Sequence, residues 1–156
     1  MTDMLVRLYD LPGDDAPVAP GVVVQRPLAA DSHHVLAFVE RHFAASAPGW
    51  VDECRCALAA RPPTCFVAAE AGAVIGFACF DATARGLFGP VGVAPDARGR
   101  GVGRALLLAC LRQMAADGYA YAVIGWAHSE AFYRRAVGAE PIAGSEPGLY
   151  AGRLRG

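Results

Sequence analysis

The stretch Arg98-Gly99-Arg100-Gly101-Val102-Gly103-Arg104-Ala105 lies between an apolar run that ends at Val93 and an apolar segment without glycine or proline until Gly118. The run before it predicts a strand, and the segment after it predicts a helix. The first turn of a helix leaves backbone N–H groups unpaired, and the helix dipole makes that end partly positive. Glycines let an anion approach these amides, and guanidinium groups pair with phosphate in a forked geometry. The stretch therefore predicts an anion-binding turn between a strand and a helix.

Two common phosphate-binding loops do not fit this stretch. A P-loop requires Lys and then Ser or Thr after its last glycine, whereas Arg104 and Ala105 follow Gly103. A dinucleotide fingerprint requires a third glycine where Arg104 stands. The remaining pattern, Arg98-x-x-Gly101-x-Gly103 after a strand, resembles the acyl-CoA pyrophosphate loop of the GCN5-related N-acetyltransferase (GNAT) superfamily. An ordinary glycine-rich turn with solvated arginines is the alternative interpretation.

The resemblance implies that the loop and the strand before it bind an acyl-CoA, with acetyl-CoA as the first expectation. The residues that it implies for cofactor binding are Val91, Val93, Arg98, Gly99, Arg100, Gly101, Val102, Gly103, Arg104 and Phe132. Gly89, Pro90 and Gly92 indicate a bulge that separates this strand from the next and frees backbone groups. By resemblance, these groups pair with the pantetheine arm, and the Val91 N–H is the oxyanion donor.

A second segment, Phe132 to Ala139, is similar to the Phe-Tyr-x-x-x-Gly-Phe signature of the same superfamily, with one extra residue before the glycine. The resemblance implies that Tyr133 lies beside the thioester sulfur and protonates the leaving thiolate, which suits the single O–H donor of a phenol. The alternative is that the aromatic pair packs the helix on the sheet, as we expect of Phe132. The stretch Trp126–Glu130 lacks the asparagine that the family often has there, and Ala139 replaces an aromatic residue.

The general base is not identified by these patterns. Some relatives carry a glutamate on the strand before the loop, whereas this chain is apolar around Leu87. His128 is a candidate because imidazole titrates near neutrality, although a surface histidine is the commoner interpretation. The alternatives are Glu130, Asp81, Glu40 and ordered water.

Acceptor recognition is expected from two segments, Ser46–Glu53 and Ala143–Gly148. Trp50 is the candidate wall of the acceptor site, and Glu53 is a candidate partner for a cationic amine, as are Asp52 and Glu146. The alternative is that Trp50 covers the core and the acids are solvated. The absence of acidic or basic runs favours a small-molecule amine over a macromolecular acceptor.

Length and composition bound the function. A chain of 156 residues with 54% hydrophobic and 19% charged residues predicts one folded domain, and residues 1–20 are expected to form an N-terminal extension. A net charge of −1 argues against nucleic-acid binding. No run of 18 apolar residues and no signal peptide are present, so we expect a cytoplasmic protein that does not bind membranes. The basic residues are all arginine, and the Ala and Gly content is typical of a GC-rich, bacterial genome.

The cysteine positions, 54, 56, 65, 79 and 110, show no C-x-x-C pair and no metal-ligand spacing with histidine. We therefore expect five small buried hydrophobic side chains, with no metal site and no disulfide. The chemistry implied by the resemblance needs no covalent enzyme intermediate, so none of the cysteines is required as a nucleophile.

The predicted elements form the order β-α-α-β-β-β-α-β-α-β. Strands are predicted over 22–26, 65–70, 74–80, 87–93 and 119–125, with a possible short one over 4–9, a loop over 10–20 and an interrupted strand over 140–154. Helices are predicted from Asp31 or Ser32 to about 45, over 50–60, from about 105 to 117 and over 130–137. This is the GNAT order, an α/β (α+β) fold with a mixed, mostly antiparallel central sheet and helices on both faces.

Three functional classes remain open from the sequence. The first is an acyl-CoA-dependent N-acyltransferase in which an amine attacks the thioester directly, through a tetrahedral intermediate, with a small-molecule or a protein or peptide acceptor. The second is a non-catalytic acyl-CoA-binding regulatory module that lacks a base. The third is an interaction domain whose loop holds no ligand. A homodimer is a family-level expectation.

Overall fold

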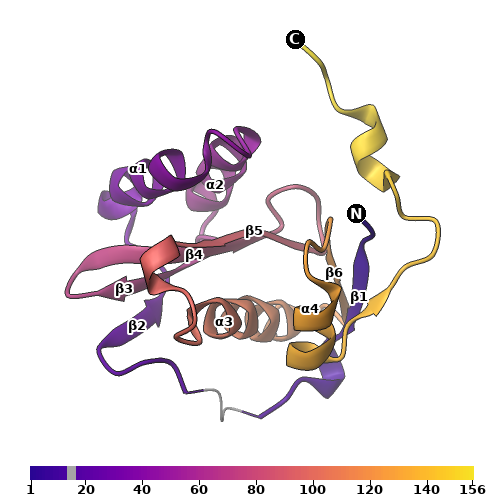
Figure 1. Cartoon of the computed structure of the whole chain (residues 1–156), viewed down its shortest axis with the longest axis horizontal. Helices are drawn as coiled ribbons and strands as arrows, with labels where there is room; N and C mark the ends of the chain where they lie inside the picture. The colour runs from indigo at the N-terminus through magenta and orange to yellow at the C-terminus, as the bar shows by residue number, and fades with distance from the viewer. Residues whose placement is uncertain (14–16) are drawn as a thin grey trace.

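The computed structural model describes residues 1–13 and 17–156, and these form one mixed sheet with helices on both faces. The sheet order is β2-β3-β4-β5-β6-β1-β7. The strands are β1 (Met4–Arg7), β2 (Val22–Gln25), β3 (Cys65–Glu70), β4 (Ala73–Phe80), β5 (Leu87–Val93), β6 (Tyr121–Ile124) and β7 (Glu140–Pro141). The helices are α1 (Ser32–Phe43), α2 (Gly49–Ala59), α3 (Val102–Ala116) and α4 (Glu130–Val137). Figure 1 shows α1 and α2 on one face of the sheet and α3 on the other.

The predicted fold class is confirmed, and most element boundaries agree with the sequence patterns to within a few residues. Ser129 caps α4 as expected, because its Oγ accepts a hydrogen bond from the Phe132 N–H at 3.4 Å. Asp31 precedes α1 but its side chain makes no capping hydrogen bond. Of the loop predicted over 10–20, residues 14–16 lie outside the described residues.

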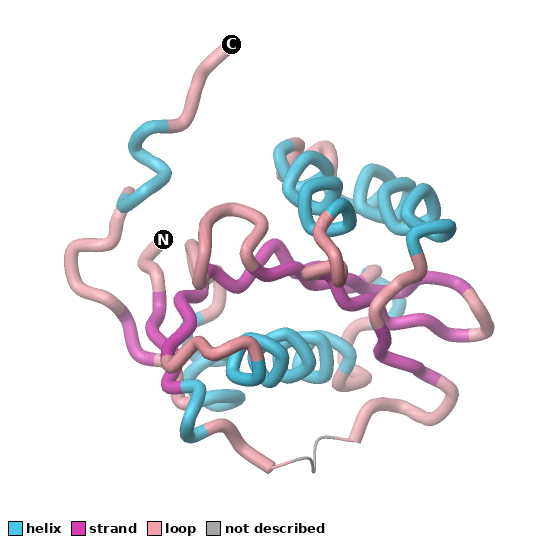
Figure 2. Tube along the Cα trace, turned by 180° about the vertical axis from the view of Figure 1, so that it is seen from behind, coloured by secondary structure: helices cyan, strands magenta, loops and turns pink. Residues whose placement is uncertain are grey.

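The strand predicted over 140–154 is wrong. Only Glu140 and Pro141 pair in the sheet, and the chain then turns away into a short 3-10 helix, Gly148–Gly152. Prolines and glycines interrupt the segment and deny it a continuous ladder of hydrogen bonds. Figure 2 shows the C-terminal segment extending away from the sheet.

The N-terminal strand β1 lies between β6 and β7 and is antiparallel to both. Met4 and Val6 are fully buried there, which explains why this short segment forms a strand inside the sheet. The N-terminal residues are thus part of the sheet beside β6, where they can position the end of that strand.

Helix α3 is the central buried element. Six side chains that its pattern marks as apolar are fully or almost fully buried: Leu106, Leu107, Leu108, Cys110, Leu111 and Met114. On the opposite face, α1 and α2 cover β4 and β5 through a separate apolar cluster that includes Phe43 and Phe77. No helix in the described part of the chain is long and apolar enough to cross a bilayer.

Candidate functional site

The turn before α3 has the conformation that its glycines predict. Gly99 and Gly101 adopt φ values of 76° and 77°, in the left-handed region that favours glycine. Gly101 is the N-cap residue of α3, and no side chain caps the helix there. A Cβ at Gly101 would lie 2.9 Å from the Pro17 carbonyl oxygen, so this position also needs the absence of a side chain. The first amides of α3 are therefore available to an anion.

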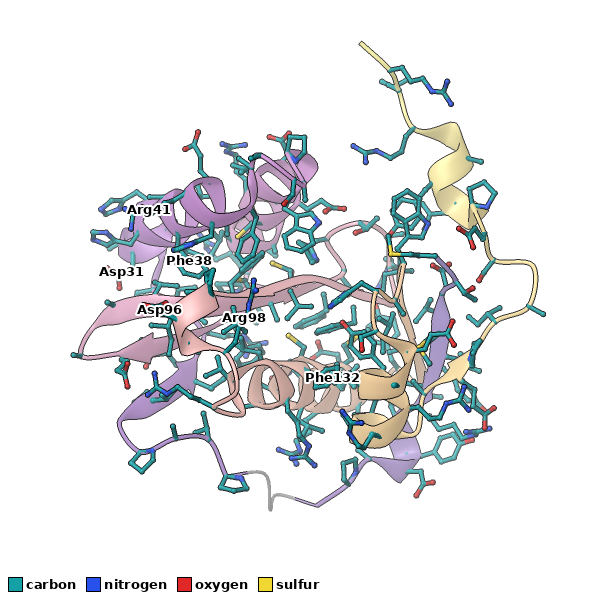
Figure 3. All side chains as sticks on the ribbon, in the orientation of Figure 1. Asp31, Phe38, Arg41, Asp96, Arg98 and Phe132 are labelled. Carbon is teal, nitrogen blue, oxygen red and sulfur yellow. The ribbon has the colours of Figure 1, made fainter. Side chains whose placement is uncertain are left out.

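The three arginines of this stretch have different partners. Arg98 Nε donates to the Val93 carbonyl oxygen at 3.2 Å, and Figure 3 shows Arg98 beside the turn that precedes α3. Arg100 forms a two-bond ion pair with Glu70 on β3, in which Nη1 donates to Oε1 at 3.1 Å. Arg104 has no hydrogen-bond or ion-pair partner among the described residues. Arg104 is consequently the cation in the first turn of α3 that is free to meet a ligand.

Strand β5 separates from β6 after a short parallel contact. The two strands pair only at Leu87 with Val123 and at Phe88 with Ile124. The register between β4 and β5 shifts between Ala78 and Phe80, so the bulge that the glycine and proline pattern predicts is present. Beyond Phe88, one edge of β5 is therefore not paired with β6.

The direction of the backbone groups on this edge follows from one hydrogen bond. Ala94 N–H donates to the Ile75 carbonyl of β4 at 2.9 Å. Because backbone groups alternate between the two edges of a strand, the N–H groups of Val91 and Val93 point away from β4. Both residues thus present donors to the opening between β5 and β6, although Arg98 already binds the Val93 carbonyl.

Tyr133 lies on the α3 side of the sheet. Its side chain is 2% exposed, and its ring packs against Phe88, Phe132 and His128 at centroid distances of 6.4, 5.1 and 5.9 Å. Burial raises the pKa of Tyr133 to about 12, which keeps the phenol protonated at neutral pH. The hydroxyl has no hydrogen-bond partner among the described residues. It is not a fully buried atom, because among those residues the only fully buried side-chain polar atom without a partner is Trp126 Nε1. The Tyr133 oxygen therefore retains some contact with solvent.

Phe132 and His128 flank this phenol from different directions. Phe132 is partly buried against the core, as expected for a residue that packs the helix on the sheet. Figure 3 shows it in the region between α3 and α4. His128 is exposed, with its ring edge-on to that of Tyr133. An exposed imidazole next to a buried phenol can exchange a proton with solvent.

The other candidate bases lie in less suitable places. Both carboxylate oxygens of Asp81 accept hydrogen bonds, from the Gly86 N–H at 2.7 Å and the Tyr119 hydroxyl at 2.8 Å. This carboxylate closes the turn between β4 and β5. Glu40 and Glu130 are exposed on helices.

The opposite face of the sheet holds the predicted acceptor residues. Trp50 is partly buried against Phe43 and Phe77, at centroid distances of 5.3 and 6.0 Å, so it covers the core as well as facing outward. Glu53, three residues along α2, accepts a hydrogen bond from Thr83 Oγ1 at 2.6 Å. Glu53 is thus held at the turn between β4 and β5, next to the start of β5.

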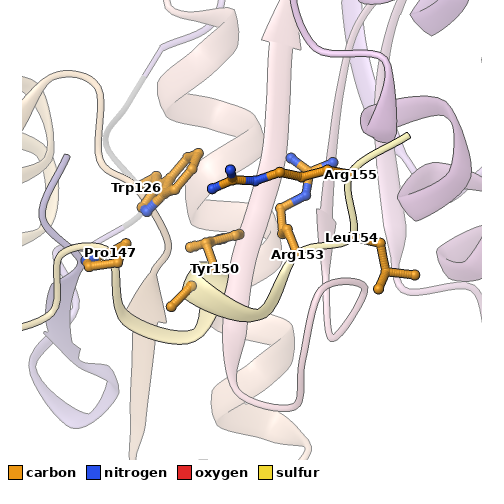
Figure 4. Close-up of a pocket in the computed structure, with 7 residues that line it drawn as sticks. Trp126, Pro147, Tyr150, Arg153, Leu154 and Arg155 are labelled. Atoms are coloured by element: carbon orange, nitrogen blue, oxygen red, sulfur yellow. The ribbon is translucent and has the colours of Figure 1, made fainter.

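The C-terminal segment packs against the end of β6 and lines a cavity there. Tyr150 packs against Trp126 with ring centroids 4.2 Å apart, and a Cβ at Gly125 would lie 2.5 Å from the Tyr150 oxygen. Burial, followed by the nearby Glu53 and Asp3 carboxylates, raises the pKa of Tyr150. Figure 4 shows the adjoining cavity of about 480 Å³. The residues that line it are Trp126, Pro147, Tyr150, Ala151, Arg153, Leu154 and Arg155.

Asp3 holds this region together from the N-terminal side. Its carboxylate accepts a hydrogen bond from the Trp126 N–H at 2.8 Å, and its own N–H donates to Ser145 Oγ at 2.9 Å. The residue is 8% exposed. Asp3 therefore links the end of β6 to the C-terminal segment.

Thr83, Trp126, Tyr150 and Arg153 belong to this site but were not predicted as parts of it from the sequence. The sequence did offer an indication for Trp126, because this residue begins the stretch that lacks the asparagine often found in the family. Tyr150 and Arg153 had none, since they belong to the segment predicted as a strand. Glu146 forms an ion pair with the N-terminal amine and does not line the cavity.

Comparisons with known proteins agree with the fold. The acetyltransferase (GNAT) family model matches residues 30–139. A search of curated proteins found no match. Among solved structures, a GCN5-related N-acetyltransferase from Sphaerobacter thermophilus is 22% identical with a TM-score of 0.72, over 90% of this chain and 48% of that one. This chain thus spans about half the length of that structure.

Two further solved structures contain a coenzyme. A GNAT family acetyltransferase from Brucella melitensis, in complex with acetyl-CoA, is 22% identical with a TM-score of 0.57, over 78% of this chain and 86% of that one. The GNAT family N-acetyltransferase YhbS from Escherichia coli, in complex with CoA, is 19% identical with a TM-score of 0.51. That comparison covers 69% of this chain and 63% of the other. At these identities the likeness shows the fold.

Proposed function

Because the chain belongs to the acetyltransferase (GNAT) family, we propose that it transfers an acyl group from an acyl-CoA, in the first instance acetyl-CoA, to a primary amine. The observation that carries this proposal is the opening beyond Phe88, where β5 leaves β6 beside the uncapped first turn of α3. A bound acyl-CoA supplies the activated thioester carbonyl and a thiolate leaving group. The protein's residues would bind the acyl-CoA, orient its thioester and protonate the leaving thiolate.

The first turn of α3 is the proposed pyrophosphate site. The amides after Gly101 point along the helix axis, and the glycines leave space for phosphate oxygens next to the backbone. Arg104 adds a cation that no described residue neutralises. Arg98 contributes charge close to Val93, whereas Arg100 is held by Glu70 and is proposed to fix the loop rather than to bind phosphate.

The edge of β5 is the proposed site of the pantetheine arm. The Val91 and Val93 N–H groups face the opening between the strands, and the arm carries amide groups that pair with such donors. The Val91 N–H is the proposed donor to the carbonyl oxygen, where negative charge develops as the amine attacks.

Tyr133 is the proposed general acid, and His128 is the proposed proton acceptor. Tyr133 would donate its phenol proton to the leaving sulfur as the amine nitrogen bonds to the carbonyl carbon and the C–S bond breaks, and the phenolate would regain a proton from water. The amine loses one proton, directly or through water, to the exposed imidazole of His128. A phenol is protonated at neutral pH, as a general acid must be, and the burial that raises the pKa of Tyr133 to about 12 makes it a weak acid that donates only to a strongly basic thiolate.

The acceptor is proposed to bind between α2 and the C-terminal segment. Glu53 is a carboxylate at the turn before β5 and is the proposed partner of a cationic amine. The cavity of about 480 Å³ beside Trp126 and Tyr150 is within the size range of small-ligand sites and supports a small-molecule amine.

The test is turnover of acetyl-CoA with a panel of amines, followed by mass spectrometry of the products. An N-acetylated amine and one equivalent of free CoA per product are expected with at least one small amine. Binding of acetyl-CoA without acetylation of any small amine or peptide would instead indicate the non-catalytic module. Absence of both binding and turnover would contradict the proposal.

A further inference from the structure

Three cysteines that are far apart in sequence meet between α2 and the hairpin formed by β3 and β4. Cys54 comes from α2, Cys65 from β3 and Cys79 from β4, and their sulfur atoms all lie within 4.8 Å of one another. Cys65 and Cys79 are direct partners in the β3–β4 ladder. The spacing along the chain gives no sign of this cluster. The fold creates it by packing α2 across the hairpin.

The surroundings of the three sulfurs are apolar. All three side chains are fully buried within a hydrophobic cluster that includes Phe38 and Phe77. Burial raises the pKa of Cys79, since a thiolate there would lose its hydration. Cys56, two residues from Cys54 on the opposite face of α2, is exposed, contrary to the prediction that the five cysteines are buried. The site therefore offers three sulfur ligands in a medium that penalises net charge.

Three sulfur ligands in apolar surroundings favour a bound centre that forms a neutral complex. Three thiolates around Cu⁺ carry a net charge of −2, and around Zn²⁺ they carry −1 and still lack the fourth ligand of a structural zinc site. Either complex leaves an uncompensated charge in an apolar core, which is costly. A trivalent, thiophilic centre with three thiolates is neutral and needs no fourth ligand. We propose that Cys54, Cys65 and Cys79 form a binding site for such a centre, with arsenite as the representative of its class.

The binding step is balanced without an oxidant. Arsenous acid, As(OH)₃, exchanges its three hydroxyl groups for three sulfurs, the three thiol protons leave with the hydroxyls as water, and arsenic remains trivalent. Sulfurs bound at about 2.3 Å from a common centre lie at most about 4.0 Å apart. The largest separation allowed by the present cluster, 4.8 Å, must therefore shrink by at least about 0.8 Å. Side-chain rotation and a small shift of α2 supply this movement.

Occupancy has a structural consequence. The three bonds join α2 to β3 and β4, which are otherwise held together here by apolar packing. A ligand that binds only the folded protein raises its stability by mass action. Because the sulfurs are fully buried, entry requires a transient opening of α2, so binding is expected to be slow.

The experiment is native mass spectrometry and thermal unfolding of the whole chain, kept reduced with a phosphine and incubated with arsenite. One arsenic per chain and a raised Tm are expected, and both are expected to disappear with excess dithiol. Cys79→Ala should abolish the adduct. Cys110→Ala is the matched control, because Cys110 is equally buried but lies outside the cluster. It should retain both the adduct and the Tm rise.

Two further variants make the result decisive. Cys54→Ala repeats the test from the helix side if Cys79→Ala does not fold. Cys56→Ser removes the exposed thiol and is expected to change neither the adduct nor the Tm rise. The proposal is overturned if the wild type binds no arsenic, or if the adduct survives Cys79→Ala or Cys54→Ala. It is also overturned if Cys56→Ser removes the adduct. None of these outcomes depends on acyltransferase activity.

Discussion

The ring of His128 stands edge-on to that of Tyr133, with 5.9 Å between centroids, and one side chain is exposed while the other is buried. This pair lies near the end of β6, on the α3 side. Such an arrangement places a solvent-accessible base next to a phenol that burial keeps protonated.

Removing the phenol proton should slow chemistry without weakening cofactor binding. Tyr133→Phe keeps the ring contacts with Phe88 and deletes only the hydroxyl, which has no partner among the described residues. We expect kcat to fall by about 10²-fold or more, with the Kd for acetyl-CoA unchanged. Steady-state kinetics and calorimetric titration measure the two quantities. An unchanged kcat would remove Tyr133 from the mechanism.

The same residue predicts a pH dependence of stability. The pKa of Tyr133 is about 12 in the folded protein and near 10.0 when the chain unfolds. Its stabilising contribution is complete below pH 10 and is lost as the pH rises toward 12, since the unfolded chain then releases the proton first. Two pKa units correspond to about 2.7 kcal/mol as an upper limit. Denaturant unfolding of wild type and Tyr133→Phe should show a steeper alkaline loss in the wild type; parallel curves would contradict this.

Glu53 is predicted to act on the acceptor and not on the cofactor. Glu53→Gln keeps an oxygen that can accept from Thr83 and removes the charge that would pair with an ammonium group. We expect KM for a cationic amine to rise by about tenfold, with acetyl-CoA affinity unchanged. Asp52→Asn is the matched control, because Asp52 pairs with Arg55 on the exposed face of the same helix. Equal effects of the two variants would exclude a specific role for Glu53.

The packing of α1 on β5 predicts a stability effect at Gly92. A Cβ there would lie within 2.6 Å of Phe43 Cε2, so the ring must move, which disturbs its packing on Trp50 and Phe77. Gly92→Ala is expected to lower the free energy of unfolding by about 1–3 kcal/mol. At Gly103 a Cβ would meet Val93 at an ordinary 3.7 Å, so Gly103→Ala should be neutral or stabilising by up to about 1 kcal/mol. Chemical denaturation that ranks the two variants in the opposite order would refute this packing.

Much of the fold could be predicted from local patterns. The glycine and arginine stretch, the apolar α3 and the Ser129 cap each specify their own conformation, because the deciding contacts are close in sequence. The C-terminal strand was predicted too long, although prolines and glycines interrupt the segment. The place beside β6 is taken by β1 from the other end of the chain, and only Glu140 and Pro141 pair with β1. No local signal reports that competition.

The candidate site shows the same division. The sequence indicated the turn before α3 and the Tyr133 helix, but it did not reveal that Glu70, 30 residues away, binds Arg100. Nor could it place Tyr150 against Trp126 or bring the three buried cysteines together. These relationships depend on which strands become neighbours, and that information lies in the tertiary structure.

The most direct test of the central claim is the Kd for acetyl-CoA of wild type, Arg104→Glu and Arg41→Glu, measured by calorimetric titration. Glutamate in the first turn of α3 favours the helix, so Arg104→Glu should fold while it repels the pyrophosphate. Arg41, exposed on α1, controls for net charge. We predict binding by the wild type and Arg41→Glu, and affinity at least about tenfold weaker for Arg104→Glu. Equal affinity of all three, or no binding by the wild type, would contradict the assignment of this turn as the acyl-CoA site.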